Sequence, residues 1–266
     1  AGSDLASLRT RAEDRGDEFV INGQKIWTSG AQNADWMFAL VRTDPAAPKH
    51  QGISFVLLPM DQPGVTVRPI RLISGTSPFC ETFFDNAVAS KQDLVGELNQ
   101  GWTVGKRLLQ HERSGQGGLG PRTGRARPVG VTVDLDVAET ALRYLGEQGG
   151  RIADPDLRAR VIDWKMASRA FGLTQQRAGE ENRAGGAPGE ATSIFKLYGS
   201  TLARERQDLL VQVMGLRGVG WEGDGFDDDE LGAMRSFLAS RAVTIYGGTN
   251  EVQQNIIAKR VLGLPD

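Results

Sequence analysis

The chain has 266 residues, with 31 basic and 33 acidic side chains and a formal net charge of −2. This near balance argues against a basic nucleic-acid surface and against a polybasic membrane anchor. Hydrophobic residues make up 39% and charged residues 24%, which is typical of a soluble globular protein with one large domain or two small ones. No apolar run reaches the ~18 residues of a transmembrane helix, so no membrane-spanning segment is expected.

Cysteine and histidine are scarce: the chain contains Cys80, His50 and His111 and no others. A single thiol cannot form an internal disulfide, so we expect a reducing, cytoplasmic environment and a packing role for Cys80. The wide sequence separation of the two histidines argues against a histidine-based metal site, and no metal is expected. The residues from Ala1 onward show no signal-peptide pattern and indicate a sequence that begins inside a longer chain.

Residues 19–88 carry the signals of short β-strands. Apolar runs at 19–21 and 24–28 flank Asn22-Gly23, and an Asn-Gly pair between apolar runs is the strongest short-range signal for a β-hairpin. Further strands are expected at 36–41, 52–58, 65–73 and 81–88. Because no helical stretch separates them, the pattern favours an antiparallel barrel or sandwich over a parallel sheet.

From Gly101 onward the apolar residues recur at helical spacing. Helices are expected from residue 101 and at 133–145, 156–177, 191–214, 232–245 and 250–262. Asp154-Pro155 predicts a helix start, since an N-cap residue precedes a proline at the first helical position. Loops are expected at 115–130, 183–189 and 215–230. The predicted fold class is α+β, with a β domain at 1–97 followed by an up-down helical bundle at 98–266.

Two short motifs match binding signatures but lack the required context. Residues 115–120 fit the glycine pattern of a dinucleotide-binding turn, yet that turn needs a preceding strand, and a helix is expected here. Residues 227–230 are four consecutive acidic residues, without the alternate spacing of a calcium loop. We expect them to form a solvated loop.

Several segments, in order along the chain, resemble the acyl-CoA dehydrogenase family. The segment 22–29, Asn-Gly-Gln-Lys-Ile-Trp-Thr-Ser, resembles the family's hairpin whose tryptophan and hydroxyl residue pack on the flavin. The segment 246–253, Tyr-Gly-Gly-Thr-Asn-Glu-Val-Gln, resembles its C-terminal signature. The other matching segments are residues 1–5, 83–88, 94–97, 212–215 and 256–263. The family's N-terminal helical domain has no counterpart in these 266 residues.

This resemblance implies an FAD-dependent oxidoreductase that dehydrogenates an acyl-CoA thioester between its α and β carbons. A carboxylate would remove the α-proton, flavin N5 would accept the β-hydride, and an electron-transferring flavoprotein would be the electron acceptor. It also implies a homo- or hetero-oligomer, a dimer or tetramer, and a role in fatty acid metabolism and lipid degradation in a bacterial cytoplasm.

The resemblance also indicates where the catalytic base lies. Many members carry a glutamate just after the tyrosine of the C-terminal signature, but that position here is Gly247, which cannot act as a base. A minority use a glutamate eleven residues after the glycine that opens the first helix of the C-terminal domain, immediately before an arginine. From Gly101 this spacing leads to Glu112, followed by Arg113. Glu112 is therefore the expected base; otherwise it would be an exposed helix carboxylate.

The resemblance supplies the remaining candidate residues. Those expected to bind the cofactor are Ser3, Trp27, Thr28, Ser29, Gln212, Gly215, Gly247, Gly248, Thr249 and Glu251. Those expected to bind the substrate are Ser3, His111, Arg113 and Arg260. Each has a structural alternative: Trp27 could be a hydrophobic cross-strand residue, and Thr249 and Glu251 could do no more than cap a helix.

The chain departs from the family pattern at two places. The arginine motif that reaches the FAD of a neighbouring subunit is replaced by the sequence around Arg143, and residues 221–230 resemble an insertion. Such insertions resemble those of actinobacterial members, some of which act on bulky or steroid-like thioesters and assemble from two different subunits. Two alternatives stay open: a flavin-dependent oxidase of the same fold, and a non-catalytic subunit of a heteromeric complex.

Overall fold

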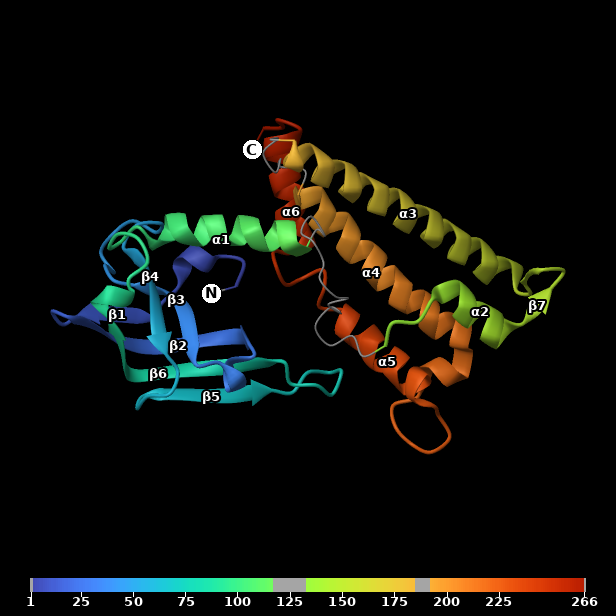
Figure 1. Ribbon diagram of the computed structural model, residues 1–266, viewed down its shortest axis with the longest axis horizontal. Coiled ribbons are helices and arrows are strands. Elements are labelled where there is room, and N and C mark those ends of the chain that lie inside the picture. Colours follow the sequence, from blue (N-terminus) through green and yellow to red (C-terminus); the bar gives the residue numbers. More distant parts are fainter. Residues whose placement is uncertain (1, 117–132, 185–191, 266) are drawn as a thin grey trace. The chain divides into compact units, whose positions relative to one another are not determined.

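The computed structural model describes residues 2–116, 133–184 and 192–265 (Figure 1). The chain divides into two compact units. The first, called here the sheet unit, consists of Ala1–Leu72 and Thr76–His111. The second, the helical unit, consists of Ile73–Gly75 and Glu112–Asp266. The β and helical regions predicted from the sequence are thereby confirmed as fold types.

The sheet unit is built on one six-stranded sheet in the order β4-β3-β1-β2-β6-β5. Its strands are β1 (Arg11–Asp14), β2 (Glu18–Ser29), β3 (Trp36–Arg42), β4 (Ile53–Pro59), β5 (Val65–Ile70) and β6 (Phe79–Ser90). Short 3₁₀ helices lie at η1 (Leu5–Ser7), η2 (Ala31–Asn33) and η3 (Lys91–Asp93). The sequence did not predict β1, because only Ala12 of its four residues is apolar and buried.

The predicted fold class, a β domain followed by a helical domain, is confirmed, but of the predicted antiparallel barrel or sandwich no closed barrel forms in the described ranges, because the sheet is mixed and open. Four of the five strand pairs are antiparallel, but β1 and β3 are parallel and share the single residue pair Arg11↔Arg42. No hydrogen-bonded ladder joins the edge strands β4 and β5 in the described ranges. The sheet nevertheless encloses a core, since Val56 of β4 and Ala89 of β6 belong to one cluster of buried side chains.

The predicted hairpin turn at Asn22-Gly23 is also wrong. β2 runs through both residues and pairs with β6 on either side of them, with a register shift between. The Asn22 side chain bonds the backbone amide of Asn86, which has left-handed φ of 55°, so the pair marks a bulge. Gly23 has φ 133°, and a Cβ there would lie 2.9 Å from Thr10 Cα. Glycine serves close backbone approach here rather than a turn.

Helix α1 (Gly101–Gln116) starts against the sheet. A Cβ at Gly101 would overlap the backbone of Ser54 and Phe55, and one at Gly105 would lie 3.2 Å from Leu40. Two glycines one turn apart therefore let the beginning of α1 lie close to β3 and β4. At 3.6 residues per turn, a spacing of four residues places both glycines on one face of the helix.

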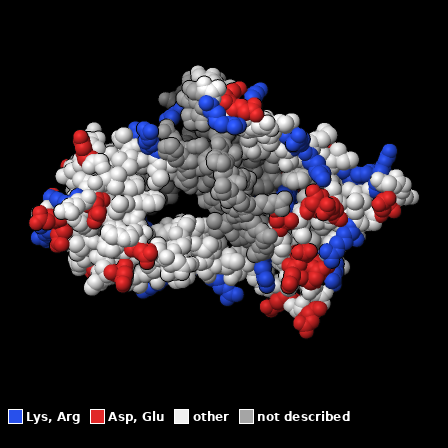
Figure 2. Space-filling view, viewed as in Figure 1, with Lys and Arg blue, Asp and Glu red and all other residues white. Residues whose placement is uncertain are grey.

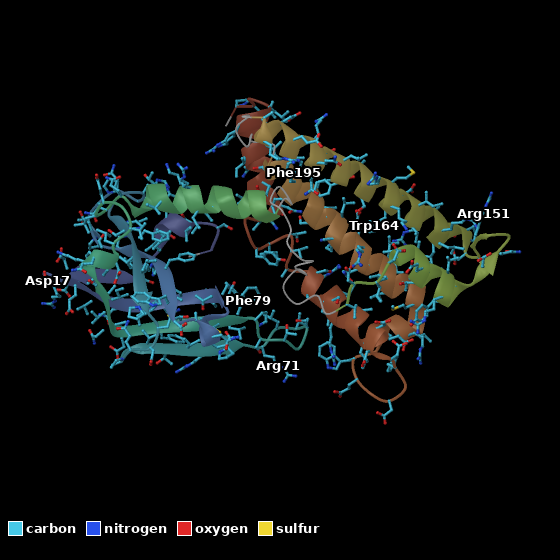
Figure 3. All side chains as sticks on the ribbon, viewed as in Figure 1. Asp17, Arg71, Phe79, Arg151, Trp164 and Phe195 are labelled. Atoms are coloured by element: carbon cyan, nitrogen blue, oxygen red, sulfur yellow. The ribbon has the colours of Figure 1, made fainter. Side chains whose placement is uncertain are left out.

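The helical unit is arranged around α4 (Thr192–Met214), the helix that packs on the others in this unit. The other helices are α2 (Val137–Leu145), α3 (Pro155–Arg183), α5 (Asp228–Ser240) and α6 (Asn250–Ile256). Figure 1 shows α3 and α4 side by side, and the indole nitrogen of Trp164 donates to the Leu202 carbonyl between them (Figure 3). Short elements complete the unit: β7 (Glu147–Gln148), β8 (Arg151–Ile152), η4 (Gly215–Val219) and the π-helical turn η5 (Ile257–Val261).

The helix-start signal at Asp154 is confirmed. Its carboxylate accepts hydrogen bonds from the amides of Asp156 and Leu157, which satisfies two of the free donors at the start of α3. Gly215, at φ 57°, ends α4 as predicted.

The expectation of a solvated acidic loop at 227–230 is wrong. Asp227 is the N-cap of α5 and forms a reciprocal capping box with Glu230. Glu230 is 2% exposed and also accepts hydrogen bonds from Tyr144 at 2.9 Å and Arg217 at 2.7 Å. The four acidic residues therefore start a helix, because negative side chains stabilise a helix N-terminus.

The surface agrees with the balanced composition. In the view of Figure 2 basic and acidic side chains are interspersed over the described residues, without a field of one sign. Over the described ranges, no helix is both long and apolar enough to cross a membrane.

Candidate functional site

Three candidate residues of the helical unit, Gly247, Gly248 and Thr249, lie in the turn between α5 and α6, residues 243–249, called here the signature turn. Gly247 and Gly248 both have left-handed φ, of 67° and 91°. A residue with a side chain would be strained at either position. The absence of a glutamate at 247 therefore agrees with the backbone that the turn adopts.

Thr249 ends the signature turn as the N-cap of α6. Its hydroxyl accepts a hydrogen bond from the Val252 amide at 3.3 Å. The pKa of Glu251 lies below its usual value, because the carboxylate bonds its own amide and the Thr249 hydroxyl. The capping role considered from the sequence is thus present. The Glu251 side chain is nevertheless exposed to solvent.

Tyr246 opens the glycine pair and is half-buried. Burial raises the pKa of its hydroxyl, so the phenol stays neutral at physiological pH. The tyrosine therefore acts as a packing group beside the glycines rather than as a base.

Glu112, His111 and Arg113 lie on α1, at positions whose side chains are outside the described residues. The backbone register is described. Eleven residues from Gly101 make three helical turns, so position 112 comes close to the helix face that carries Gly101 and Gly105.

Trp27 is the most unusual candidate of the sheet unit. It sits at a β2 bulge, where the register with β6 shifts between Lys25 and Thr28, and its φ is 63°. Left-handed backbone is rare for a bulky side chain and stores strain. Trp27 is 56% exposed, and its ring meets that of Phe79 edge-on, at 6.2 Å between ring centroids. Its position resembles a presented aromatic face more than a core residue.

The two hydroxyls after Trp27 differ. Thr28 donates to the Cys80 carbonyl at 2.8 Å and lies 2.9 Å from the Thr82 hydroxyl, so it is engaged within the sheet. Ser29 is exposed. Of the pair, Ser29 is the better candidate for an external ligand. Cys80 is fully buried, as its packing role predicted.

Three candidates lie at exposed positions. Gln212, on the last turns of α4, accepts a hydrogen bond from Arg160 across to α3. Ser3 precedes η1, and Arg260 lies in the π-helical turn after α6. A π-helical turn often marks a functional site, but the described contacts assign no ligand to Arg260.

Arg143, which stands where the family's arginine reaches a neighbouring subunit, contacts residues of its own chain. It forms ion pairs with Asp227 at 2.8 Å and Asp229 at 3.7 Å, at the start of α5. Arg143 therefore links α2 to the start of α5 through ion pairs within this chain.

Sequence reasoning missed two buried side chains beside the signature turn. Lys196 of α4 is 7% exposed, and Gln253 of α6 is 1% exposed. A lysine inside the apolar run Ile194-Phe195-Lys196-Leu197 was the available signal. In the described ranges, no group of three His, Cys, Asp or Glu side chains is arranged to hold a metal ion.

Two family models match the chain. The acyl-CoA dehydrogenase middle domain matches residues 1–87, and the acyl-CoA dehydrogenase C-terminal domain matches residues 99–262. The two matches cover most of the sheet unit and most of the helical unit.

Individual relatives carry the same family name as the two matching models. Acyl-CoA dehydrogenase IpdE1 of Mycobacterium tuberculosis is 40% identical over 268 residues, covering 100% of this chain and 64% of the relative. The chain thus spans less than two thirds of that relative's length. Among solved structures, the Tcur3481-Tcur3483 steroid ACAD is 32% identical, with a TM-score of 0.84, over 100% of this chain and 66% of that chain. The ChsE4-ChsE5 complex from Mycobacterium tuberculosis is 29% identical, with a TM-score of 0.79, over 100% and 67%.

Proposed function

Because this chain belongs to the acyl-CoA dehydrogenase family, we propose that its protein dehydrogenates an acyl-CoA thioester between the α and β carbons with FAD as cofactor. One observation carries the assignment of the base. The signature turn has a glycine with left-handed backbone at 247, whereas a glutamate stands on α1 eleven residues after Gly101. The chain thus has a glycine at one of the two positions where the family carries its base and a glutamate at the other.

The residues present fit a flavin. Trp27 offers an exposed aromatic face from a rigid, strained bulge, and Ser29 follows it with an exposed hydroxyl. The signature turn offers Gly247 and Gly248, whose left-handed backbone aims their amides where a residue with a side chain would be strained, and Thr249 at a helix start. Ser3, Thr28, Gln212, Gly215 and Glu251 complete the proposed cofactor set. When bound, FAD supplies the acceptor for the β-hydride, and an electron-transferring flavoprotein is the proposed partner that collects the electrons.

The chain's own residues would handle the α-proton and the substrate. Glu112 takes the proton, and a bound acyl chain that excludes water raises the pKa of its carboxyl and makes it a stronger base. Backbone amides of the signature turn would stabilise the negative charge that develops on the thioester oxygen. His111, Arg113, Arg260 and Ser3 are the proposed substrate contacts.

Relatives support a narrower proposal for the substrate and the assembly. One similar structure is described as a steroid ACAD and another as a complex of two named chains. We therefore infer that this protein acts on a bulky, polycyclic acyl thioester and works as an oligomer, either of two different subunits or of identical ones. A bacterial cytoplasm is the proposed location and lipid degradation the proposed pathway class.

The test is a Glu112→Gln variant of the complete protein. The variant should bind FAD as the parent does, but turnover should fall by about 10²–10⁴-fold, the usual contribution of a general base. Glu139→Gln, at an exposed position of α2, is the matched control and should keep parental activity. Full turnover in Glu112→Gln would overturn the assignment of the base. A colourless parent protein would point instead to a non-catalytic subunit.

A further inference from the structure

Lys196 is a charged side chain in the interior of the helical unit. Its ammonium donates to the Val243 carbonyl and lies 5.0 Å from the centroid of the Tyr246 ring. Both partners belong to the signature turn, one at its start and one just before the glycine pair. A buried ammonium is costly, and an apolar side chain would fill the same volume, so packing alone does not explain a lysine here.

Two further polar side chains hold the same segment. Ser200, one helical turn after Lys196, donates to the Asn250 side chain at 3.1 Å. Gln253, from α6, donates to the Gly248 carbonyl at 3.4 Å. A Cβ at Gly248 would overlap the amide nitrogen of Gln253, so the glutamine and the glycine are matched in space.

Backbone hydrogen bonds hold the turn on both sides of its glycine pair. The amides at 245 and 246 donate to the Ala242 carbonyl, and the Asn250 amide donates to the Thr244 carbonyl at 3.0 Å. Gly247 and Gly248, between these bonds, add conformational freedom. Glycines that accept unusual φ angles need surrounding groups to select one conformation. Here those groups are the side chains of Lys196 and Ser200 from α4 and of Gln253 from α6.

We propose that Lys196 and Gln253, assisted by Ser200, are positioning residues that hold the signature turn in the one conformation able to receive the cofactor and the thioester. This inference rests on the proposed function for what the turn receives. The physical claim about the turn is separate: without the ammonium, its backbone samples more conformations.

The first experiment needs no cofactor. Amide hydrogen exchange is compared in the parent, in Lys196→Met, which keeps the apolar stem, and in Lys196→Arg, which keeps the charge. Residues 244–250 should exchange about tenfold faster in Lys196→Met, with near-parental rates in Lys196→Arg and unchanged rates at 203–213 of α4. Gln253→Met repeats the test if Lys196→Met does not fold. Lys165→Met, on the exposed side of α3, is the control. Unchanged exchange at 244–250 would overturn the proposal.

The second experiment uses the complete protein with FAD. Lys196→Met should lower kcat by at least about tenfold and reduce the flavin bound per chain, with a smaller change in KM, and Lys196→Arg should restore part of both. Faster exchange with unchanged flavin content and kcat would overturn the role in the site. If the parent binds no flavin and turns over no thioester, the proposed function fails, whereas the exchange result still decides whether Lys196 holds the turn.

Discussion

In the sheet unit, left-handed backbone falls on three residues that have side chains, Trp27, Asn86 and Asn99, whereas in the described part of the helical unit it falls on glycines alone. Asn86 and Asn99 tolerate this backbone and gain hydrogen bonds in return, from Asn22 and Thr43. Trp27 gains no such bond among the described contacts. The sheet unit thus keeps strain at a candidate binding residue.

The helical unit relies on buried polar side chains instead. Glu230 joins the start of α5 to Tyr144 and Arg217, and Lys196 holds the signature turn. Glycines adopt left-handed backbone there without strain, and buried charged side chains fix the conformation of the segments they contact. The two units therefore fix their candidate binding residues differently. In the sheet unit the backbone at Trp27 is strained, whereas in the helical unit an unstrained glycine turn is held by a buried charged side chain.

The largest effect is expected where a buried charge is removed. Glu230→Ala leaves the Tyr144 hydroxyl, the Arg217 Nε and the Asp227 amide without the charged acceptor they share, and should lower the free energy of unfolding by about 4 kcal/mol. Asp229→Ala, at an exposed ion pair, should change it by less than about 0.5 kcal/mol. Urea denaturation at pH 7 measures both. Equal losses in the two variants would contradict the role of buried charge.

The same carboxylate should make stability depend on pH. Burial would raise the pKa of Glu230, but hydrogen bonds from Arg217, the Asp227 amide and Tyr144 outweigh it and lower the pKa below 4.5. The stabilisation is therefore present above pH 4.5 and is lost as the pH falls through the lower folded pKa. The difference between parent and Glu230→Ala should shrink accordingly below pH 4.5.

A smaller loss is expected at the bulge of β2. Gly23→Ala places a Cβ 2.9 Å from Thr10 Cα at a φ of 133° and should cost about 3 kcal/mol. Gly16→Ala, at φ 91° with open space around it, isolates the backbone strain and should cost about 1 kcal/mol. Thermal unfolding of both variants gives the difference. A Gly16 variant as unstable as the Gly23 variant would rule out the steric part.

The sheet unit also contains a buried charge, the ammonium of Lys25, which should lower the stability of the fold while it is protonated. The ammonium donates to the Leu40 carbonyl at 2.6 Å, and burial lowers its pKa from 10.5 to about 8. The unfolded chain keeps the proton up to pH 10.5, while the folded chain releases it above about 8. The parent should therefore gain about 3 kcal/mol of stability between these values. Lys25→Met should not show this gain, whereas Lys49→Met, at an exposed ion pair, should retain it.

The smallest change concerns strain at Trp27. Trp27→Gly removes the penalty of a φ of 63° and should raise the free energy of unfolding by about 1 kcal/mol while weakening flavin binding. Trp36, equally exposed at 55% but in the regular strand β3, is the matched control. Trp36→Gly should lower stability by about 0.5–1 kcal/mol, since glycine weakens a strand. Loss of stability in both variants would show that the bulge stores no strain.

Local signals in the sequence predicted much of the fold. The cap at Asp154, the stop at Gly215 and the apolar runs of β3 and β4 depend on neighbouring residues, and these predictions are confirmed. The Asn22-Gly23 signal is equally local but was misleading, since Asn-Gly serves a bulge as well as it serves a turn. Which of the two forms depends on Thr10 and Asn86, which are distant in the sequence.

For the candidate site, too, some features follow from the sequence and others only from the tertiary structure. The sequence by itself determined the family and the α+β organisation, because both follow from residue identities at fixed spacings along the chain. It also led to the proposal of Glu112 as the base, since position 247 is a glycine. Only the tertiary structure decided that the sheet stays open, that Trp27 is strained and exposed, and that Lys196 and Gln253 lie under the signature turn. Burial and backbone strain arise from contacts between residues far apart in the chain, so no local pattern encodes them.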